Sequence, residues 1–234
     1  MAAQRRKKEI QDETLIDLAQ AKVSAEHFLE RNSKMLIGIL VGLFVIVGGY
    51  LFYTYMIVEP RQKEAVEQMF QAEIQFEKDS FDLALNNPGG GYAGFLKIID
   101  QYGGTRAANT AKYYAGISYL NLGNFEEAIR YLEDFSPKDD ITKAMKLGAL
   151  GDAYAEQNDL DKALSQYQKA ANAGDNALLT PYYLMKVGQL SEMQNNFSEA
   201  RKAYERIRDE YPTADEGVDI EKYIVRLDAK EGKG

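Results

Sequence analysis

The feature that most constrains this chain is a stretch of 24 residues, 35–58, without a charged side chain. It reads MLIGILVGLFVIVGGYLFYTYMIV and lies between Lys34 and Glu59. As an α-helix it would be about 36 Å long, enough to cross a hydrocarbon core of about 30 Å. A buried core helix is seldom uncharged over such a length, and no A-x-A site follows, as it would after a cleaved signal peptide. The stretch therefore predicts a transmembrane signal-anchor helix.

Lys and Arg are unevenly distributed about this stretch. Residues 1–34 carry seven, whereas the 15 residues that follow the stretch carry only Arg61 and Lys63. Positive residues near a span stay in the cytoplasm. We therefore expect 1–34 to be a cytoplasmic basic segment and 59–234 to be exported. Apolar residues from Ile10 to Arg31 recur at helical spacing, which predicts an amphipathic helix that lies on the membrane or docks on a partner.

Small residues form one stripe on the predicted span. Gly38 and Gly42 make a GxxxG pattern, and Gly49 follows seven residues later on roughly the same face. Small residues let a second helix approach closely, so the stripe is a candidate for packing against another membrane helix. The alternative is that glycine is simply common in such spans.

Three segments of the exported part repeat one another: Ala111 to Phe135, Lys146 to Ala170 and Tyr183 to Ile207. Aligned, they share two columns of small residues, and the glycines of the first column are 35 and 37 residues apart. This pattern resembles the tetratricopeptide repeat, a helical hairpin whose two helices (A and B) meet at small residues. The Trp of that family is absent, and only the third copy ends with Pro. The columns are Gly116, Gly151 and Gly188, then Ala128, Ala163 and Ala200.

A degenerate copy is expected before these three, over residues 60–105. Gly91 to Thr105 parallels Ala200 to Ala214, and helix A of this copy would extend from about Pro60 to Leu85. A charged, amphipathic segment at the other end predicts a capping helix. The predicted fold class is all-α, a single N-terminal transmembrane helix followed by a tetratricopeptide α-solenoid with a C-terminal capping helix. Its full repeats would cover about 109–140, 144–175 and 181–213, and its capping helix 214–230.

By this resemblance, the A helices line a concave face that binds partner proteins. The lining is mostly apolar and aromatic, which suits adaptable binding, and it lacks the Lys and Arg set that clamps a carboxylate in some tetratricopeptide domains. The alternative is that these residues pack against the chain's own helices. The candidate partner-binding residues are Tyr113, Ile117, Leu120, Met145, Asp152, Tyr182, Met185 and Gln189, and Glu192 lies on the same face.

The composition leaves little room for catalysis. The chain has no Cys and one His, and that His precedes the span. We therefore expect no enzyme, no metal site and no cofactor. Residues 59–234 contain 21 basic and 30 acidic side chains, a net charge of −9, whereas the whole chain has a net charge of −8. So acidic a domain is a poor partner for nucleic acid.

The whole layout is similar to the YfgM-like family of ancillary Sec translocon subunits. The residues that suggest it are Gly94 to Thr105 and Ala111 to Gly123. The resemblance implies a bacterial inner-membrane protein with a periplasmic repeat domain. It also implies Sec translocon subunits, a membrane-anchored peptidyl-prolyl isomerase-like chaperone and nascent secretory chains as partners. The alternative function is a general cell-envelope scaffold, in cell-wall or outer-membrane assembly, that is not tied to the translocon.

Overall fold

The computed structural model describes the backbone of residues 2–232 and the side chains of Lys22 and residues 28–232. The chain divides into two compact units, 1–58 and 59–234. Every regular element among the described residues is a helix, and none is a strand. The all-α prediction is thereby confirmed.

The first unit is helical throughout its described part. Helix α1, Ala2–Tyr53, contains most of the uncharged stretch. Its apolar side chains are exposed, with Phe44 at 79%, and by length and composition the helical segment Phe28–Glu77 could cross a membrane. The predicted amphipathic helix from Ile10 to Arg31 falls within α1, but most of its apolar side chains lie outside the described residues.

A π-helical turn, η1, covers Thr54–Val58 at the end of this unit. Pro60 follows two residues later. Proline has no N–H to bond the carbonyl four residues earlier, here Met56, and its ring clashes with that carbonyl in a regular α-helix. A π turn widens the backbone at this carbonyl. We attribute η1 to Pro60.

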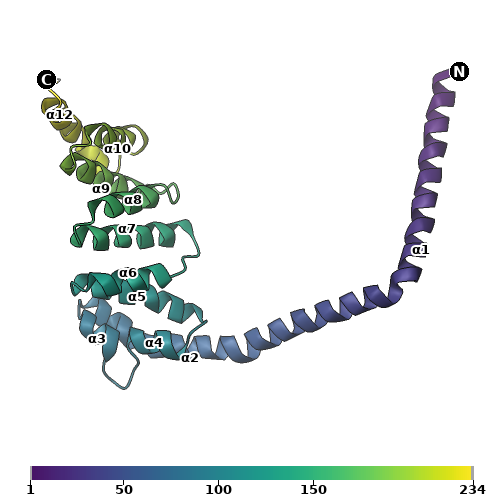
Figure 1. Cartoon of the computed structure of the whole chain (residues 1–234), viewed down its shortest axis with the longest axis horizontal. Helices are drawn as coiled ribbons and strands as arrows, with labels where there is room; N and C mark the ends of the chain where they lie inside the picture. Colours follow the sequence, from purple (N-terminus) through teal and green to yellow (C-terminus); the bar gives the residue numbers. More distant parts are fainter. Residues whose placement is uncertain (1, 233–234) are drawn as a thin grey trace. The chain divides into compact units, whose positions relative to one another are not determined.

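The second unit is a stack of helical hairpins. Figure 1 shows helices α5 to α10 in successive layers. In each of three hairpins an A helix packs on the B helix that follows it, and each B helix also packs on the next A helix. The A helices are α5 (Arg106–Asn121), α7 (Asp140–Glu156) and α9 (Leu179–Met193), and the B helices are α6 (Phe125–Asp134), α8 (Leu160–Ala171) and α10 (Phe197–Glu210).

The A helices end in the same backbone turn. Gly123, Asn158 and Asn195 have φ of 75°, 60° and 59°. The next residue donates its N–H to the carbonyl five residues back, as Asn124 does to Tyr119 at 2.9 Å. This is the Schellman arrangement, which requires a left-handed residue that Gly adopts freely and that Asn tolerates.

The degenerate copy that precedes these three hairpins, called the first repeat below, has this turn as well, at a position that the sequence did not predict. Helix α2, Glu59–Glu77, is its A helix, and Asp79 takes the left-handed position with φ 55°. The expected extension of this helix to Leu85 is therefore wrong. Helix α3 (Phe81–Asn86) begins the B helix, and Ala84 stands at the position of Ala128, fully buried.

An insertion splits the B helix of this first repeat. Residues 87–94 form a loop, and helix α4, Phe95–Gln101, resumes the B helix after it. Gly94 passes so close to the Leu85 carbonyl that a Cβ would collide with it. Phe95 then stacks on Tyr114 of α5, with ring centroids 5.1 Å apart. The pairing of Gly91–Thr105 with the third repeat thus describes only the second half of this B helix.

The two small-residue columns lie where the helices of a hairpin meet. A Cβ on Gly116 would lie 2.6 Å from Cγ of Leu132, and one on Gly151 would lie 2.5 Å from Cε1 of Tyr167. Gly188 is equally tight against Tyr204. Ala128, Ala163 and Ala200 have no exposed surface.

The C-terminal end of the stack is covered by two short helices. Helix α11 spans Asp215–Val218 and helix α12 spans Ile220–Lys230. The predicted cap therefore exists but is interrupted at Asp219. Ile220, Ile224 and Leu227 of α12 join the core of the third hairpin.

Candidate partner-binding face

Five positions on each A helix, spaced by four, three, four and four residues, point to one side because 3.6 residues make a turn. We name this side the A-helix face. It starts one turn before the predicted lining residues. Its members are Gln62, Val66, Met69, Glu73 and Glu77 on α2; Arg106, Thr110, Tyr113, Ile117 and Asn121 on α5; Ile141, Met145, Gly148, Asp152 and Glu156 on α7; and Leu178, the residue directly before α9, with Tyr182, Met185, Gln189 and Met193 on α9.

Exposed apolar side chains gather at the start of α7 and α9. Ile141 is 51% exposed and Leu178 is 74% exposed. Tyr182 follows at 42%, and Met145 is half-buried. We name these four residues the apolar lane. Single exposed apolar residues are ordinary, but a group at matching positions of consecutive repeats is typical of an interaction surface.

The middle of the face is occupied by the protein's own packing. Tyr113 lies against Phe135, with ring centroids 5.4 Å apart, and burial raises its pKa to about 12. Ile117 packs beside the buried Leu132, and Met185 packs on the core of the third hairpin. Gly148 receives the ring of Tyr183 so closely that a Cβ would clash with it. Tyr113, Ile117 and Met185, which were predicted as binding residues, therefore take part in the protein's own packing.

Asp152 is held by two neighbouring helices. It accepts a hydrogen bond from the Tyr167 hydroxyl of α8 at 2.7 Å and an ion pair from Lys186 of α9 at 2.6 Å. The Lys186 ammonium also lies over the ring of Tyr182, 5.3 Å from its centroid. Burial is the largest single effect and lowers the pKa of Lys186, but the hydrogen bond and charge of Asp152 together with Tyr182 outweigh it, so the pKa is raised. Lys186 therefore fixes the positions of Asp152 and Tyr182.

A hollow of about 580 Å³ opens beside this ion pair. Leu120 and Asn121 of α5 line one side, and Asp152, Glu156 and Lys186 line the other. The structure thus brings Leu120 and Asp152, both predicted as binding residues, to one cavity. Gln189 is exposed one turn beyond Met185.

Glu192 lies on the same helix but is closed off. It is 6% exposed and receives Arg226 at 2.6 Å and Lys230 at 2.9 Å, both from α12. Tyr204 donates a third bond at 3.1 Å. Burial raises the pKa of this carboxyl, but the hydrogen bonds from Arg226, Lys230 and Tyr204 outweigh it and lower the pKa to about 2. The capping helix therefore covers this position.

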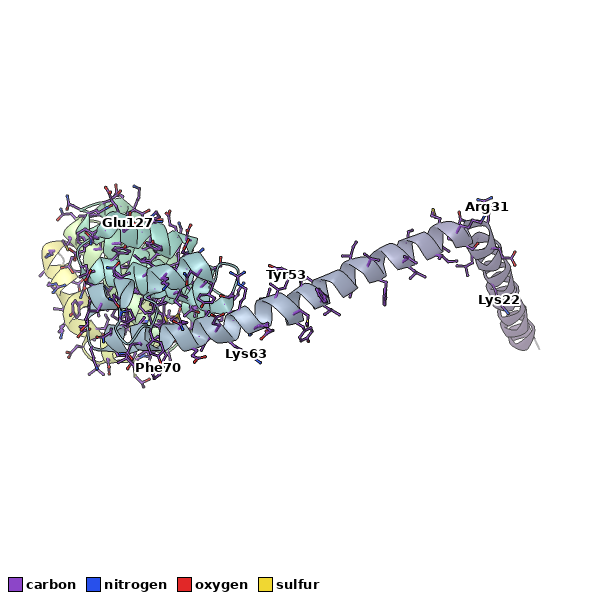
Figure 2. The ribbon with its side chains drawn as sticks, turned by 90° about the horizontal axis from the view of Figure 1, so that it is seen from below. Lys22, Arg31, Tyr53, Lys63, Phe70 and Glu127 are labelled. Carbon is purple, nitrogen blue, oxygen red and sulfur yellow. The ribbon has the colours of Figure 1, made fainter. Side chains whose placement is uncertain are left out.

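The other end of the stack is not covered in the same way. Val66 and Phe70 of α2 are 50% and 58% exposed, and Figure 2 shows Phe70 pointing outward. In the next repeat Tyr114 takes the position of Phe70, and the Phe76 and Phe95 rings of the first repeat cover it. No repeat precedes α2 in the second unit, so Phe70 stays exposed.

Three residues of the site were not found from the sequence. Ile141 and Leu178 lie one helical turn before Met145 and Tyr182, so extending the same spacing would have found them. Lys186 shares a helix face with Tyr182, but the direction of its side chain depends on Asp152 in another repeat. In the first unit, Gly38, Gly42 and Gly49 have no atom near the Cβ position, so the stripe is open. Among the described residues, no group of three or more side chains could hold a metal.

Comparison with known protein families agrees with this architecture. Two family models, both described as tetratricopeptide repeat, match residues 110–136 and residues 149–215. No curated protein matches the chain. Tetratricopeptide repeats are typically protein–protein interaction scaffolds without enzymatic activity. The chain therefore carries tetratricopeptide repeats between residues 110 and 215, and a helix that is apolar and long enough to span a membrane precedes them.

Proposed function

We propose that this protein is a membrane-anchored scaffold that binds partner proteins on the A-helix face. The observation that carries the proposal is the apolar lane, at corresponding positions of two consecutive repeats, in which Ile141, Leu178 and Tyr182 are exposed and Met145 is half-buried. Repeats of this kind bind extended segments along such faces. The residues that flank the lane are held rigidly by the Asp152–Lys186 ion pair, which reduces the entropy lost on binding.

We further propose a bacterial inner-membrane location, with 1–34 cytoplasmic and the repeat domain periplasmic. The excess of Lys and Arg before the span supports this orientation. The proposed partners are Sec translocon subunits, a membrane-anchored isomerase-like chaperone and nascent secretory chains. The likeness of the layout to YfgM-like proteins supports these partners. The open stripe of Gly38, Gly42 and Gly49 would pack against a partner's membrane helix.

Photo-crosslinking in native membranes tests the face and its partners together. A crosslinking residue at Leu178 or Tyr182 should give adducts with translocon subunits and the chaperone. A crosslinking residue at Glu126, which is exposed on α6 outside the face, is the matched control and should give few. Adducts with cell-wall or outer-membrane assembly factors would instead support the general envelope scaffold. Equal adducts from Leu178 and Glu126 would contradict a binding role for the face.

A further inference from the structure

The charged side chains in the C-terminal half of the A-helix face are all acidic. Its two last positions on each A helix hold Glu73 and Glu77 on α2, Asp152 and Glu156 on α7, and uncharged residues on α5 and α9. Two of these eight positions hold the apolar Ile117 and Met193, and we name the six polar residues the acidic lane: Glu73, Glu77, Asn121, Asp152, Glu156 and Gln189. Its only charges are therefore carboxylates.

These carboxylates differ in whether they are neutralised. Asp152 is paired with Lys186. Glu73, Glu77 and Glu156 form no ion pair in the part of the chain that the structure describes. Burial, and then repulsion by Glu77, raises the pKa of Glu73. Glu73 and Glu77 also raise the pKa of Tyr114, after the larger effect of burial, which places both carboxylates toward α5.

The apolar and acidic lanes run along the same face. On α7 the order is Ile141, Met145, Gly148, Asp152 and Glu156. A segment that crosses α7 therefore meets apolar side chains along one edge and a carboxylate along the other; the apolar edge continues at α9, and the unpaired carboxylates recur on α2. Positively charged groups in the bound segment would neutralise those carboxylates, whereas an acidic segment would be repelled.

We propose that the occupant of the A-helix face is a cationic amphipathic segment, with apolar side chains toward Ile141, Leu178 and Tyr182 and Lys or Arg toward Glu77 and Glu156. This inference rests on the proposed function and narrows it to one chemical class of partner. The apolar edge supplies most of the affinity, because exposed ion pairs contribute little each. The acidic lane supplies the selection among partners.

The test uses the full-length protein in nanodiscs of uncharged lipid, with empty nanodiscs as the reference. The probe is a labelled Leu/Lys amphipathic peptide of about 18 residues, five helical turns, and its partner probe has Glu in place of every Lys. Fluorescence anisotropy should show that the Leu/Lys peptide binds at least ~10-fold more tightly than the Leu/Glu peptide. Raising the salt from about 0.05 to about 0.5 M should reduce that difference.

Two double variants locate the effect. Glu77→Lys with Glu156→Lys should weaken binding of the Leu/Lys peptide ~10-fold. Glu126→Lys with Glu221→Lys changes the net charge by the same amount at exposed positions off the face, and should leave binding nearly unchanged. Circular dichroism checks that the unmodified protein and every variant are folded. Glu77→Gln with Glu156→Gln should give a smaller loss in the same direction.

Three outcomes would overturn the inference: equal or tighter binding of the Leu/Glu peptide, equal losses in the two Lys variants, or no binding of either peptide. These outcomes would not by themselves contradict the proposed function, which is tested separately by crosslinking. Selective adducts at Leu178 and Tyr182 together with any of these outcomes would mean that the face binds partners of a different chemistry. Absence of selective adducts at Leu178 and Tyr182 would count against the proposed function itself.

Discussion

Gly151 sets the distance between α7 and α8 because it has no side chain. The ring of Tyr167 fills the space where its Cβ would be, and the Tyr167 hydroxyl then reaches Asp152 on the A-helix face. One glycine thus links the packing of a hairpin to the position of a surface carboxylate. The recurrence of glycine at 116, 151 and 188 predicted this close approach, whereas the partner ring and its bond to Asp152 depend on three-dimensional packing.

Gly151→Ala should therefore destabilise the repeat domain by about 1–2 kcal/mol, because overpacking in the core outweighs the better helix propensity of Ala. The measurement is thermal or urea unfolding of the full chain by circular dichroism. Gly103→Ala is the control, since the nearest atom to its Cβ is the Ile99 carbonyl oxygen at 3.6 Å, and it should change stability by less than about 0.5 kcal/mol. Equal effects of the two substitutions would refute the packing argument.

The capping helix α12 is bound to the hairpin of α9 and α10 by ion pairs as well as by apolar contacts. Arg226 and Lys230 both bind Glu192, whereas Ile220, Ile224 and Leu227 are in the core. Apolar spacing predicted the helix. The ion pairs were not predicted, because a residue assigned to the binding face proved to be the acceptor.

Acid should loosen this attachment. The pKa of Glu192 is lowered from 4.5 to about 2 in the folded chain, so its ionised form stabilises the fold above about pH 4.5, and that contribution is lost as the pH falls toward 2. Hydrogen exchange of α12 should therefore become faster, relative to α7, between these pH values. Glu192→Gln should remove this pH dependence and cost about 1–3 kcal/mol, since it leaves two cations without their acceptor. Unchanged protection of α12 in this variant would disprove the attachment.

The inserted loop of the first repeat is a second element with a measurable property. Gly89, Gly90 and Gly91 are exposed and have positive φ, so extra residues there lengthen an existing loop at a cost of only about 0.6 kcal/mol per doubling of its length. We expect a Gly-Ser-Gly-Ser insertion after Gly90 to leave the unfolding temperature almost unchanged. The same insertion after Asn158 should lower it clearly, because it breaks the hydrogen bond from Asp159 to Tyr154.

The sequence revealed less of this first repeat than of the others for a physical reason. Because of the loop, the residues before it lie further than one 35-residue period from their counterparts in the next repeat, as Asp79 does from Gly123, and Asp79 occupies a turn position that Gly or Asn holds elsewhere. Only after the loop does the pattern return, at Phe95, Ile98 and Tyr102, all buried. In the later repeats the spacing is nearly constant, so the hairpins and their small-residue columns could be predicted.

For the whole molecule, the orientation of the chain is the property that decides which partners it can meet. The chain contains no Cys, so a single introduced Cys reports its own side of the membrane. Lys22→Cys and Glu126→Cys should behave oppositely toward a membrane-impermeant maleimide in spheroplasts. Position 126 should react at once, and position 22 only after permeabilisation. Labelling of both before permeabilisation, or of neither, would contradict the predicted orientation.

The four turns that end the A helices share one backbone conformation, at Asp79, Gly123, Asn158 and Asn195. If the segment between two of these turns were deleted or duplicated, the chain would rejoin at a turn of the same backbone conformation. The segment between two successive turns is thus an exchangeable repeat, and the stack can gain or lose whole repeats without a new type of turn. Lineages carrying such a chain can change the length of the partner-binding surface by recombination while leaving the anchor and the cap as they are.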